Sequence, residues 1–243
     1  MNQPFLLNCD MGESFGHYQI GNDQALMPYI DAANIACGMH AGDPVQIERT
    51  IDLALAHEVF IGAHPGYPDL NGFGRRIIPM SQEELAACIR YQVAALVGMT
   101  KARGGKVTYV KPHGALYNQM AEDAEVAKTV VSAILEVTAS LKIMGLAGSL
   151  VQTVVEDAGA QFIAEAFADR AYEDNGQLRS RKLAGAVYDD PKKAAKQVLS
   201  VLHEQSLTSF HGKKISIKAE SFCIHGDNPA ALQIAQVIRT AIQ

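Results

Sequence analysis

The chain has 243 residues, of which 48% are hydrophobic and 19% charged, and its formal net charge is −5. This composition supports a sizeable core and excludes intrinsic disorder, and there is no basic excess for binding nucleic acid. The amino-terminal sequence lacks the features of a signal peptide and no segment is apolar over the length of a membrane span, so we expect a cytoplasmic protein without a membrane partner.

Short apolar runs recur along the sequence, and most are continuous rather than alternating, which predicts parallel strands covered on both faces. They span residues 5–8, 32–36, 59–63, 107–110, 142–146, 161–167 and 221–224. Helical patterns lie between them, over residues 22–29, 81–103, 122–140, 149–157 and 190–206. Two further helices are expected to begin at Asp43-Pro44 and at Asn228-Pro229, where a capping residue precedes a proline.

The strands and helices alternate strictly, and no linker or low-complexity segment divides them. We therefore expect a single α/β domain over residues 1–243, with right-handed crossovers and a parallel sheet. An open doubly wound sheet fits this alternation as well as a closed one does. We favour an irregular seven-stranded parallel (β/α) barrel because of the positions of the polar residues.

Polar side chains stand at or just after the carboxyl end of six of the seven strands. They are Asp10 and Glu13, His40 and Asp43, His64 and Asp69, Lys111 and His113, Glu165 with Asp169 and Arg170, and His225 with Asp227. In a barrel these strand ends converge on a single mouth, which is where barrel enzymes carry out their chemistry. An open sheet would instead spread the same residues along an edge.

Four of the eight histidines lie at these strand ends: His40, His64, His113 and His225. Neutral imidazoles beside carboxylates suit two chemistries. The first is a divalent metal held by two histidines and an aspartate. The second is metal-free acid–base catalysis, in which a carboxylate activates water and a lysine or histidine stabilises an oxyanion. The sequence has no HExxH motif, so spacing does not decide between them.

The sequence contains no P-loop motif, and no GxGxxG motif follows the first predicted strand, so this chain does not hold ATP in a P-loop. Two connections could bind anions: residues 72–76 (GFGRR) and residues 170–188. The second connection is long enough to form a lid or binding loop. The second carries Arg170, Arg179, Arg181 and Lys182, which could hold a carboxylate or a phosphate. The four cysteines show no CxxC pairing and are expected to pack as small hydrophobic residues.

Six segments, in this order, resemble the LamB/YcsF family over essentially the whole chain: LNCDMGESFG, ANIACGMHAGDP, GAHPGYPDLNGFGRR, YVKPHGALYN, AEAFADRAY and IHGD. The resemblance implies a seven-stranded barrel related to glycoside hydrolases and polysaccharide deacetylases. It also implies an activity, the opening of 5-oxo-L-proline to L-glutamate with ATP hydrolysis, in a complex with 5-oxoprolinase subunits B and C. ATP would then bind in the complex.

On this hypothesis Asp10 or Glu13 acts as the general base, and Lys111 and His113 stabilise the developing charge. The expected catalytic set is Asp10, Glu13, Lys111, His113 and Glu165. The expected substrate-binding set is His40, Arg170 and Asp227, with Arg170 on the substrate carboxylate. If a divalent metal is bound, the expected ligands are His40, His64 and His225.

Two other functions stay open from the sequence. One is a metal-dependent carbohydrate deacetylase or hydrolase, inferred from the relatives of the fold. The other is a non-catalytic scaffold subunit that only positions its partners in the complex.

Overall fold

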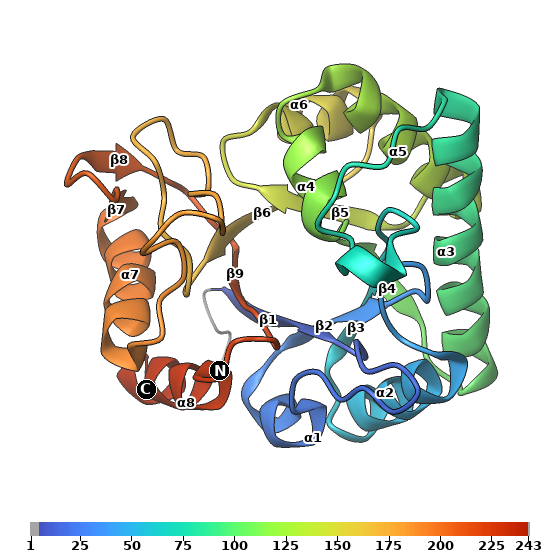
Figure 1. Cartoon of the computed structure of the whole chain (residues 1–243), viewed down its shortest axis with the longest axis horizontal. Helices are drawn as coiled ribbons and strands as arrows, with labels where there is room; N and C mark the ends of the chain where they lie inside the picture. Colours follow the sequence, from blue (N-terminus) through green and yellow to red (C-terminus); the bar gives the residue numbers. More distant parts are fainter. Residues whose placement is uncertain (1–4, 243) are drawn as a thin grey trace.

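Seven parallel strands close into a barrel in the computed structural model, which describes residues 5–242. The strand order is β1-β2-β3-β4-β5-β6-β9, and Figure 1 shows the ring with its helices outside. The strands are β1 (Leu6–Met11), β2 (Ala32–Ala36), β3 (Phe60–His64), β4 (Val107–Val110), β5 (Lys142–Leu146), β6 (Phe162–Phe167) and β9 (Ser221–Ile224). Because β9 pairs with both β1 and β6, the sheet has no free edge, and the predicted closed barrel is confirmed.

The outer layer consists of helices that follow the strands (Figure 1). The long ones are α2 (Pro44–Ala56), α3 (Gln82–Ala102), α5 (Ala124–Val137), α6 (Leu150–Asp157), α7 (Pro191–Glu204) and α8 (Ala231–Ala241). Shorter elements are α1 (Asp23–Leu26), η1 (Met27–Tyr29), η2 (Leu70–Gly72) and α4 (Gly114–Met120). The predicted cap at Asp43 is present, since its side chain accepts from the first turn of α2, and Ser81 and Glu84 form a capping box on α3.

Several element boundaries differ from the prediction. Strand β1 continues to Met11, because its buried residues run on past Asn8, so Asp10 lies within the strand. Helix α8 begins at Ala231, since Asn228 first forms a turn in which its side chain accepts from the backbone N–H of Ala230. Helix α4 was not predicted, nor was the antiparallel pair β7 (Ser206–Thr208) and β8 (Lys214–Ser216), because these elements are too short to give a periodic pattern.

The interior of the barrel has an apolar floor beneath a polar layer. Ala32, Tyr109, Met144 and Ile163 form a small buried cluster that is separate from the main core. Tyr109 fits there because its neighbour across the sheet is Gly62, where a Cβ atom would overlap the tyrosine ring. The Tyr109 hydroxyl donates to Asn34 Oδ1 at 2.6 Å, and this bond joins the floor to the polar layer above it.

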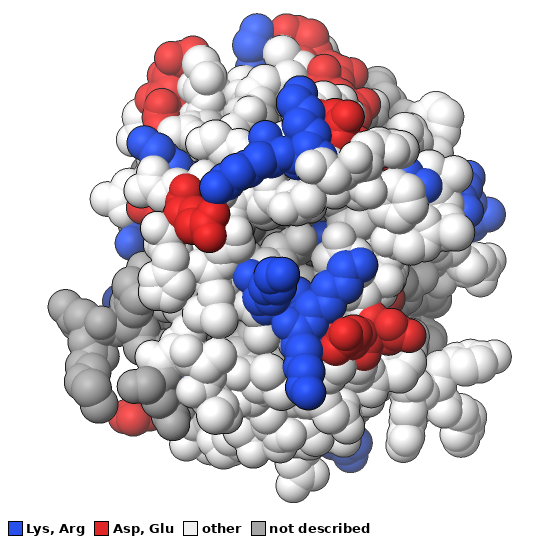
Figure 2. Space-filling model, turned by 90° about the vertical axis from the view of Figure 1, so that its left-hand side faces the viewer, with Lys and Arg blue, Asp and Glu red and all other residues white. Residues whose placement is uncertain are grey.

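Charged side chains are mixed on the outer surface that carries α7, α8 and the β7–β8 pair. Figure 2 shows lysine and arginine side chains there in small groups beside acidic ones, rather than as one basic stripe. The ion pair of Lys214 with Glu204, at 2.7 Å, belongs to this region. Within residues 5–242 no helix has the length and hydropathy needed to cross a membrane.

Candidate functional site

A buried lysine lies at the centre of the mouth. Lys111 Nζ is 3.1 Å from Asp10 Oδ1 and 2.8 Å from Glu165 Oε1. It also donates to Asn8 Oδ1 at 3.3 Å and contacts Cys223 Sγ at 3.0 Å. All five residues are buried. The ammonium group therefore lies between two carboxylates and forms an ion pair with each of them. We call these five residues the lysine group.

The electrostatics of the lysine group keep Lys111 and Asp10 charged. Burial alone would lower the pKa of Lys111, but Asp10, Cys223 and Glu165 together raise that pKa well above its ordinary value. Burial alone would raise the pKa of Asp10, but Lys111 and His64 hold it well below its ordinary value. An ionised Asp10 can accept a proton from water, and a charged Lys111 can stabilise an oxyanion.

Glu165 supports Lys111 from inside the barrel. Tyr117 donates its hydroxyl to Glu165 Oε2 at 2.7 Å, and Asn8 donates its amide to Glu165 Oε1 at 2.9 Å. With Lys111 as a third partner and no exposed surface, Glu165 holds the ammonium group in place. Glu165 was predicted from the sequence, whereas Asn8 and Tyr117 were not, although Asn8 shares a strand face with Asp10 and this spacing was an available signal.

Three of the predicted histidines gather around Glu13. One side-chain atom from each of Glu13, His40, His64 and His113 lies within 4.8 Å of the others, and all four residues are buried. Glu13 Oε1 is 3.5 Å from His40 Nε2 and 3.6 Å from His113 Nδ1. The rings of His40 and His113 stack with their centroids 3.8 Å apart. These four residues, which we call the histidine group, could hold a metal ion.

Burial shapes the protonation of the histidine group. Burial and the neighbouring imidazoles lower the pKa values of His40 and His113 well below the ordinary value, which favours the neutral rings. Burial and the charge of Asp10 raise the pKa of Glu13 well above its ordinary value. Of the two predicted bases, Asp10 is therefore the one held ionised by its surroundings.

His225 lies apart from the histidine group. It belongs to a second group of potential ligands with Asp10 and Cys223, and its Nδ1 is 2.8 Å from Asp169 Oδ1. The predicted ligand set of His40, His64 and His225 is therefore not brought together, because β9 delivers His225 beside Asp169 instead. Cys223 was expected only to pack in the core, but its sulfur faces Lys111.

Arginines line the other side of the mouth. Arg75, from the GFGRR loop, and Arg181, from the 170–188 connection, each lie 3.1 Å from Asp227 Oδ2. Arg170 donates to the backbone carbonyls of Ala186 and Arg179, at 3.2 and 2.5 Å. Burial and the neighbouring Arg181 lower the pKa of Arg170 to about 10, so it stays charged at neutral pH.

Three other predicted residues form ion pairs and hydrogen bonds within the loops. Asp227 holds two arginines, and a carboxylate in that position would repel an anionic substrate. Asp69 pairs with Arg76 and caps η2, and it is not among the potential ligands of the histidine group. Asp43 caps α2 and accepts from the backbone N–H of Gly16 at 2.9 Å.

Two adjoining cavities open at the mouth. The first, of about 30 Å³, is lined by the side chains of Asp10, Lys111, His113 and His225 among others, and has room for about one water molecule. The second, of about 360 Å³, lies beneath the 170–188 connection and shares Arg75, Arg170 and Leu178 with the first. A water near Asp10 and a small anion beside the arginines would thus be neighbours.

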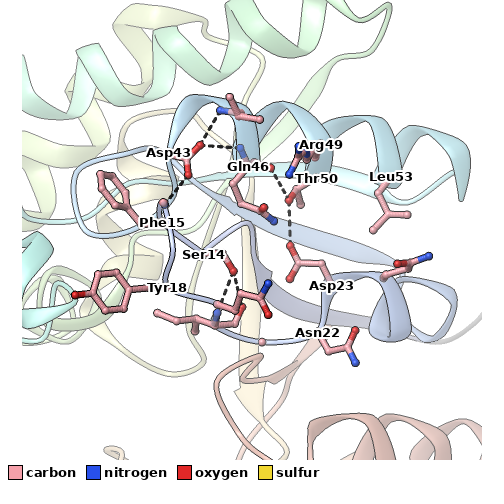
Figure 3. Close-up of a pocket in the computed structure, with 16 residues that line it drawn as sticks. Ser14, Phe15, Tyr18, Asn22, Asp23, Asp43, Gln46, Arg49, Thr50 and Leu53 are labelled. Carbon is pink, nitrogen blue, oxygen red and sulfur yellow. Dashed lines mark hydrogen bonds between the residues drawn. The ribbon is translucent and has the colours of Figure 1, made fainter.

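A further hollow of about 800 Å³ lies beside the loop that follows β1 (Figure 3). Asp23 accepts from the backbone N–H of Gly12 at 2.8 Å and from the hydroxyl of Thr50 at 3.0 Å. Figure 3 shows Asp43 reaching toward this loop and Asp23 pointing to Thr50 of α2. Their carboxylates are occupied by these bonds, and the loop they fix begins with Gly12 and Glu13. The two carboxylates therefore help to position Glu13.

Comparisons with known proteins agree with this architecture. A model of the LamB/YcsF family matches residues 6–243. The A subunit of 5-oxoprolinase from Syntrophobacter fumaroxidans is 46% identical over 237 residues, which is 98% of this chain and 94% of that protein. The crystal structure of a lactam utilization protein from Thermus thermophilus has a TM-score of 0.93 at 38% identity, and the match covers 99% of this chain and 96% of that one.

A family 4 carbohydrate esterase from Streptomyces lividans has a TM-score of 0.51 at 12% identity, and the match covers 99% of this chain and 90% of that one. That likeness shows a shared barrel and nothing about the reaction. The family match and the identity to the relatives confirm the resemblance of the six sequence segments. The chain belongs to the LamB/YcsF family.

Proposed function

We propose that this chain is a subunit of an ATP-dependent 5-oxoprolinase and opens a lactam that its partner subunits have activated. The names of its relatives, the A subunit of 5-oxoprolinase and a lactam utilization protein, support this reaction class. The observation that carries the proposal is the pair of Asp10 and Lys111 at the water-sized cavity, next to an arginine-lined hollow. The pair supplies a base and a cation for attack on a carbonyl-type carbon.

The lactam explains why ATP is needed. In a five-membered ring the amine and the carboxyl group are tethered, so the effective concentration that favours ring closure opposes hydrolysis. Phosphorylation of the lactam oxygen makes the ring carbon electrophilic. Because this chain has no P-loop or GxGxxG motif, we assign ATP binding and phosphorylation to subunits B and C.

The proposed steps consume one ATP and two water molecules for each glutamate. Asp10 accepts a proton from the first water as its oxygen attacks the ring carbon of the phosphorylated lactam. The ring C–N bond then breaks, the nitrogen takes a proton, and an acyl phosphate remains. A second water attacks the acyl carbon and releases L-glutamate and phosphate.

Lys111 is the better candidate for stabilising the developing negative charge. It is an ammonium group 3.1 Å from Asp10, at the wall of the water-sized cavity. His113, the other predicted candidate, has Nε2 at 2.9 Å from the carbonyl of Phe73 and Nδ1 at 3.0 Å from His64. Burial and the neighbouring imidazoles lower the pKa of His113 and favour its neutral ring, whereas Lys111 is positively charged and Glu165 positions it.

The arginines of the larger cavity are suited to the acidic groups of the substrate. Arg75, Arg170 and Arg181 carry three positive charges, and Asp227 is the carboxylate that pairs with two of them. Arg181 Nε and Nη2 are buried without a hydrogen-bond partner among the described residues. Guanidinium groups bind carboxylate and phosphate oxygens well, so we assign this cavity to the substrate carboxylate and the phosphoryl group.

A second candidate function has one observation in its favour. The histidine group could hold a metal, as a metal-dependent carbohydrate deacetylase would require. Acetate release from an acetylated oligosaccharide by the purified chain alone would support that reading and contradict the lactam assignment.

The test of the proposal uses the purified chain with and without subunits B and C. Glutamate and phosphate release from 5-oxo-L-proline and ATP should require all the subunits together. Robust ATP turnover by this chain alone would overturn the division of labour. Full activity of subunits B and C without this chain would overturn its catalytic role.

A further inference from the structure

We propose that the histidine group, Glu13, His40, His64 and His113, binds one divalent transition-metal ion, for which zinc is the best match. The four residues come from the ends of β1, β2, β3 and β4, so the barrel itself brings them together. The proposal does not depend on the lactam reaction, because metal binding can be measured on this chain alone.

The hydrogen bonds of two rings fix where their protons lie. His64 Nδ1 is 2.6 Å from the backbone carbonyl of Lys111, and His113 Nε2 is 2.9 Å from the backbone carbonyl of Phe73. A carbonyl oxygen only accepts hydrogen bonds, so each of these nitrogens must carry the proton. Metal-binding histidines commonly donate their second N–H to a carbonyl in this way, which orients the ring.

The remaining nitrogens of the same two rings face each other. His64 Nε2 and His113 Nδ1 are 3.0 Å apart, and in neutral rings with the protons placed as above both present lone pairs. While both rings are neutral, neither nitrogen can donate to the other, so the contact is repulsive unless a proton or a metal ion lies beside both. A metal ion would replace this repulsion with two coordinate bonds.

Glu13 and His40 supply the other ligands. Glu13 Oε1 and both ring nitrogens of His40 are buried without a hydrogen-bond partner among the described residues. Leaving such atoms unpaired costs about 1–3 kcal/mol each, so a bound ligand is the simplest explanation. In a tetrahedral zinc site with bonds of about 2.1 Å the ligand atoms lie about 3.4 Å apart. The separations of 3.0, 3.5 and 3.6 Å observed in this group match that spacing.

The second group of potential ligands, Asp10, Cys223 and His225, is a poor site for a metal. Lys111 Nζ already lies 3.1 Å from Asp10 Oδ1 and 3.0 Å from Cys223 Sγ, so an ammonium group occupies the position of a cation. His225 Nδ1 is committed to Asp169. A divalent ion in the histidine group would polarise a bound oxygen next to Asp10, since His64 Nε2 is 3.5 Å from Asp10 Oδ1.

The experiment uses the full chain, stripped with a chelator and titrated with Zn²⁺ by calorimetry, with the metal content measured after gel filtration. We expect one equivalent of zinc in the wild type. Glu13→Gln and His113→Gln should each weaken binding by at least about 100-fold, because loss of a ligand costs more than loss of a residue that supports one. His203→Gln, a change of an exposed histidine on α7, is the matched control and should leave the affinity unchanged.

Folding of each variant is checked by circular dichroism in the absence of metal. Should a variant fail to fold, the spectrum of Co²⁺ bound to the wild type decides, because nitrogen and oxygen ligands in a four-coordinate site give an intense d–d absorption. Absence of stoichiometric binding by the wild type would overturn the proposal. So would a loss of affinity in His225→Asn with none in His113→Gln, since that result would place the metal in the second group.

Discussion

The lysine group and the histidine group lie side by side at the same mouth, yet they differ in how completely their polar atoms are paired. In the lysine group the ammonium of Lys111 meets two carboxylates, and Glu165 has three partners. In the histidine group Glu13 Oε1 and both nitrogens of His40 have no hydrogen-bond partner among residues 5–242. The charged atoms of the first group are paired with one another, whereas the second group leaves three buried atoms without a hydrogen-bond partner among the described residues.

Removal of the central cation should have the largest effect on stability. Lys111→Met would leave Asp10 and Glu165 buried without a compensating charge, and we expect the free energy of unfolding to fall by about 3–5 kcal/mol. Urea denaturation measures this change. Lys196→Met, a change of an exposed lysine on α7, should stay within about 0.5 kcal/mol of the wild type. A cost below about 1 kcal/mol for Lys111→Met would show that the lysine group is not held together by its charges.

Zinc bound at the histidine group should stabilise the folded protein. At a free Zn²⁺ concentration of about 100 times its Kd, the free energy of unfolding of the wild type should rise by about 2.7 kcal/mol. The metal-free protein serves as the reference in the same urea titration. Glu13→Gln should lose most of this gain, because it removes one ligand. An equal gain in Glu13→Gln would assign the stabilisation to zinc bound elsewhere.

Loss of a single hydrogen-bond donor to the lysine group should lower the free energy of unfolding by a smaller amount. Tyr117→Phe removes the hydroxyl that donates to Glu165 Oε2 at 2.7 Å, in a buried environment. We expect a loss of about 2 kcal/mol in the free energy of unfolding, since hydrogen bonds to charged groups contribute about 1.5–3 kcal/mol. The matched control is Tyr91→Phe, at an exposed position of α3, which should change little. Equal effects of the two substitutions would contradict the assigned role.

The smallest effect is expected from the loop that carries Glu13. Asp23→Asn weakens the contacts to the backbone N–H of Gly12 and the hydroxyl of Thr50. The cost should be about 1 kcal/mol in stability, with Zn²⁺ affinity lowered by about 10-fold because Asp23 acts only through the position of Glu13. Calorimetry on Asp23→Asn tests this. An unchanged affinity would show that the loop holds Glu13 without Asp23.

Much of this architecture could be predicted from the sequence, for physical reasons. Continuous apolar runs indicated parallel strands, and the polar residues at their carboxyl ends indicated closure, which the pairing of β9 with β1 and β6 confirms. Lys111 and His113, two residues apart after β4, were expected to face the same mouth, and both line the water-sized cavity. Strand ends are predictable because each apolar run has to stop where the chain leaves the core.

The division of the mouth into two groups could not be predicted. It depends on the path of the loop after β1, where Gly12 adopts a φ of +70° and turns Glu13 toward His40 and His113. It depends also on Asp169, which binds His225 across the contact of β6 with β9. Asn8 and Cys223 were not predicted because each lies within an apolar run, where only packing was expected.

The central claim is that Asp10 activates the water that opens the lactam, and one substitution tests it most directly. In the complex with subunits B and C, Asp10→Asn should lower glutamate release from 5-oxo-L-proline and ATP by about 100- to 10,000-fold, the usual contribution of a general base. Gel filtration should show the complex still assembled, and Asp52→Asn, on the outer face of α2, should retain activity. Glutamate release at the wild-type rate by Asp10→Asn would contradict the account.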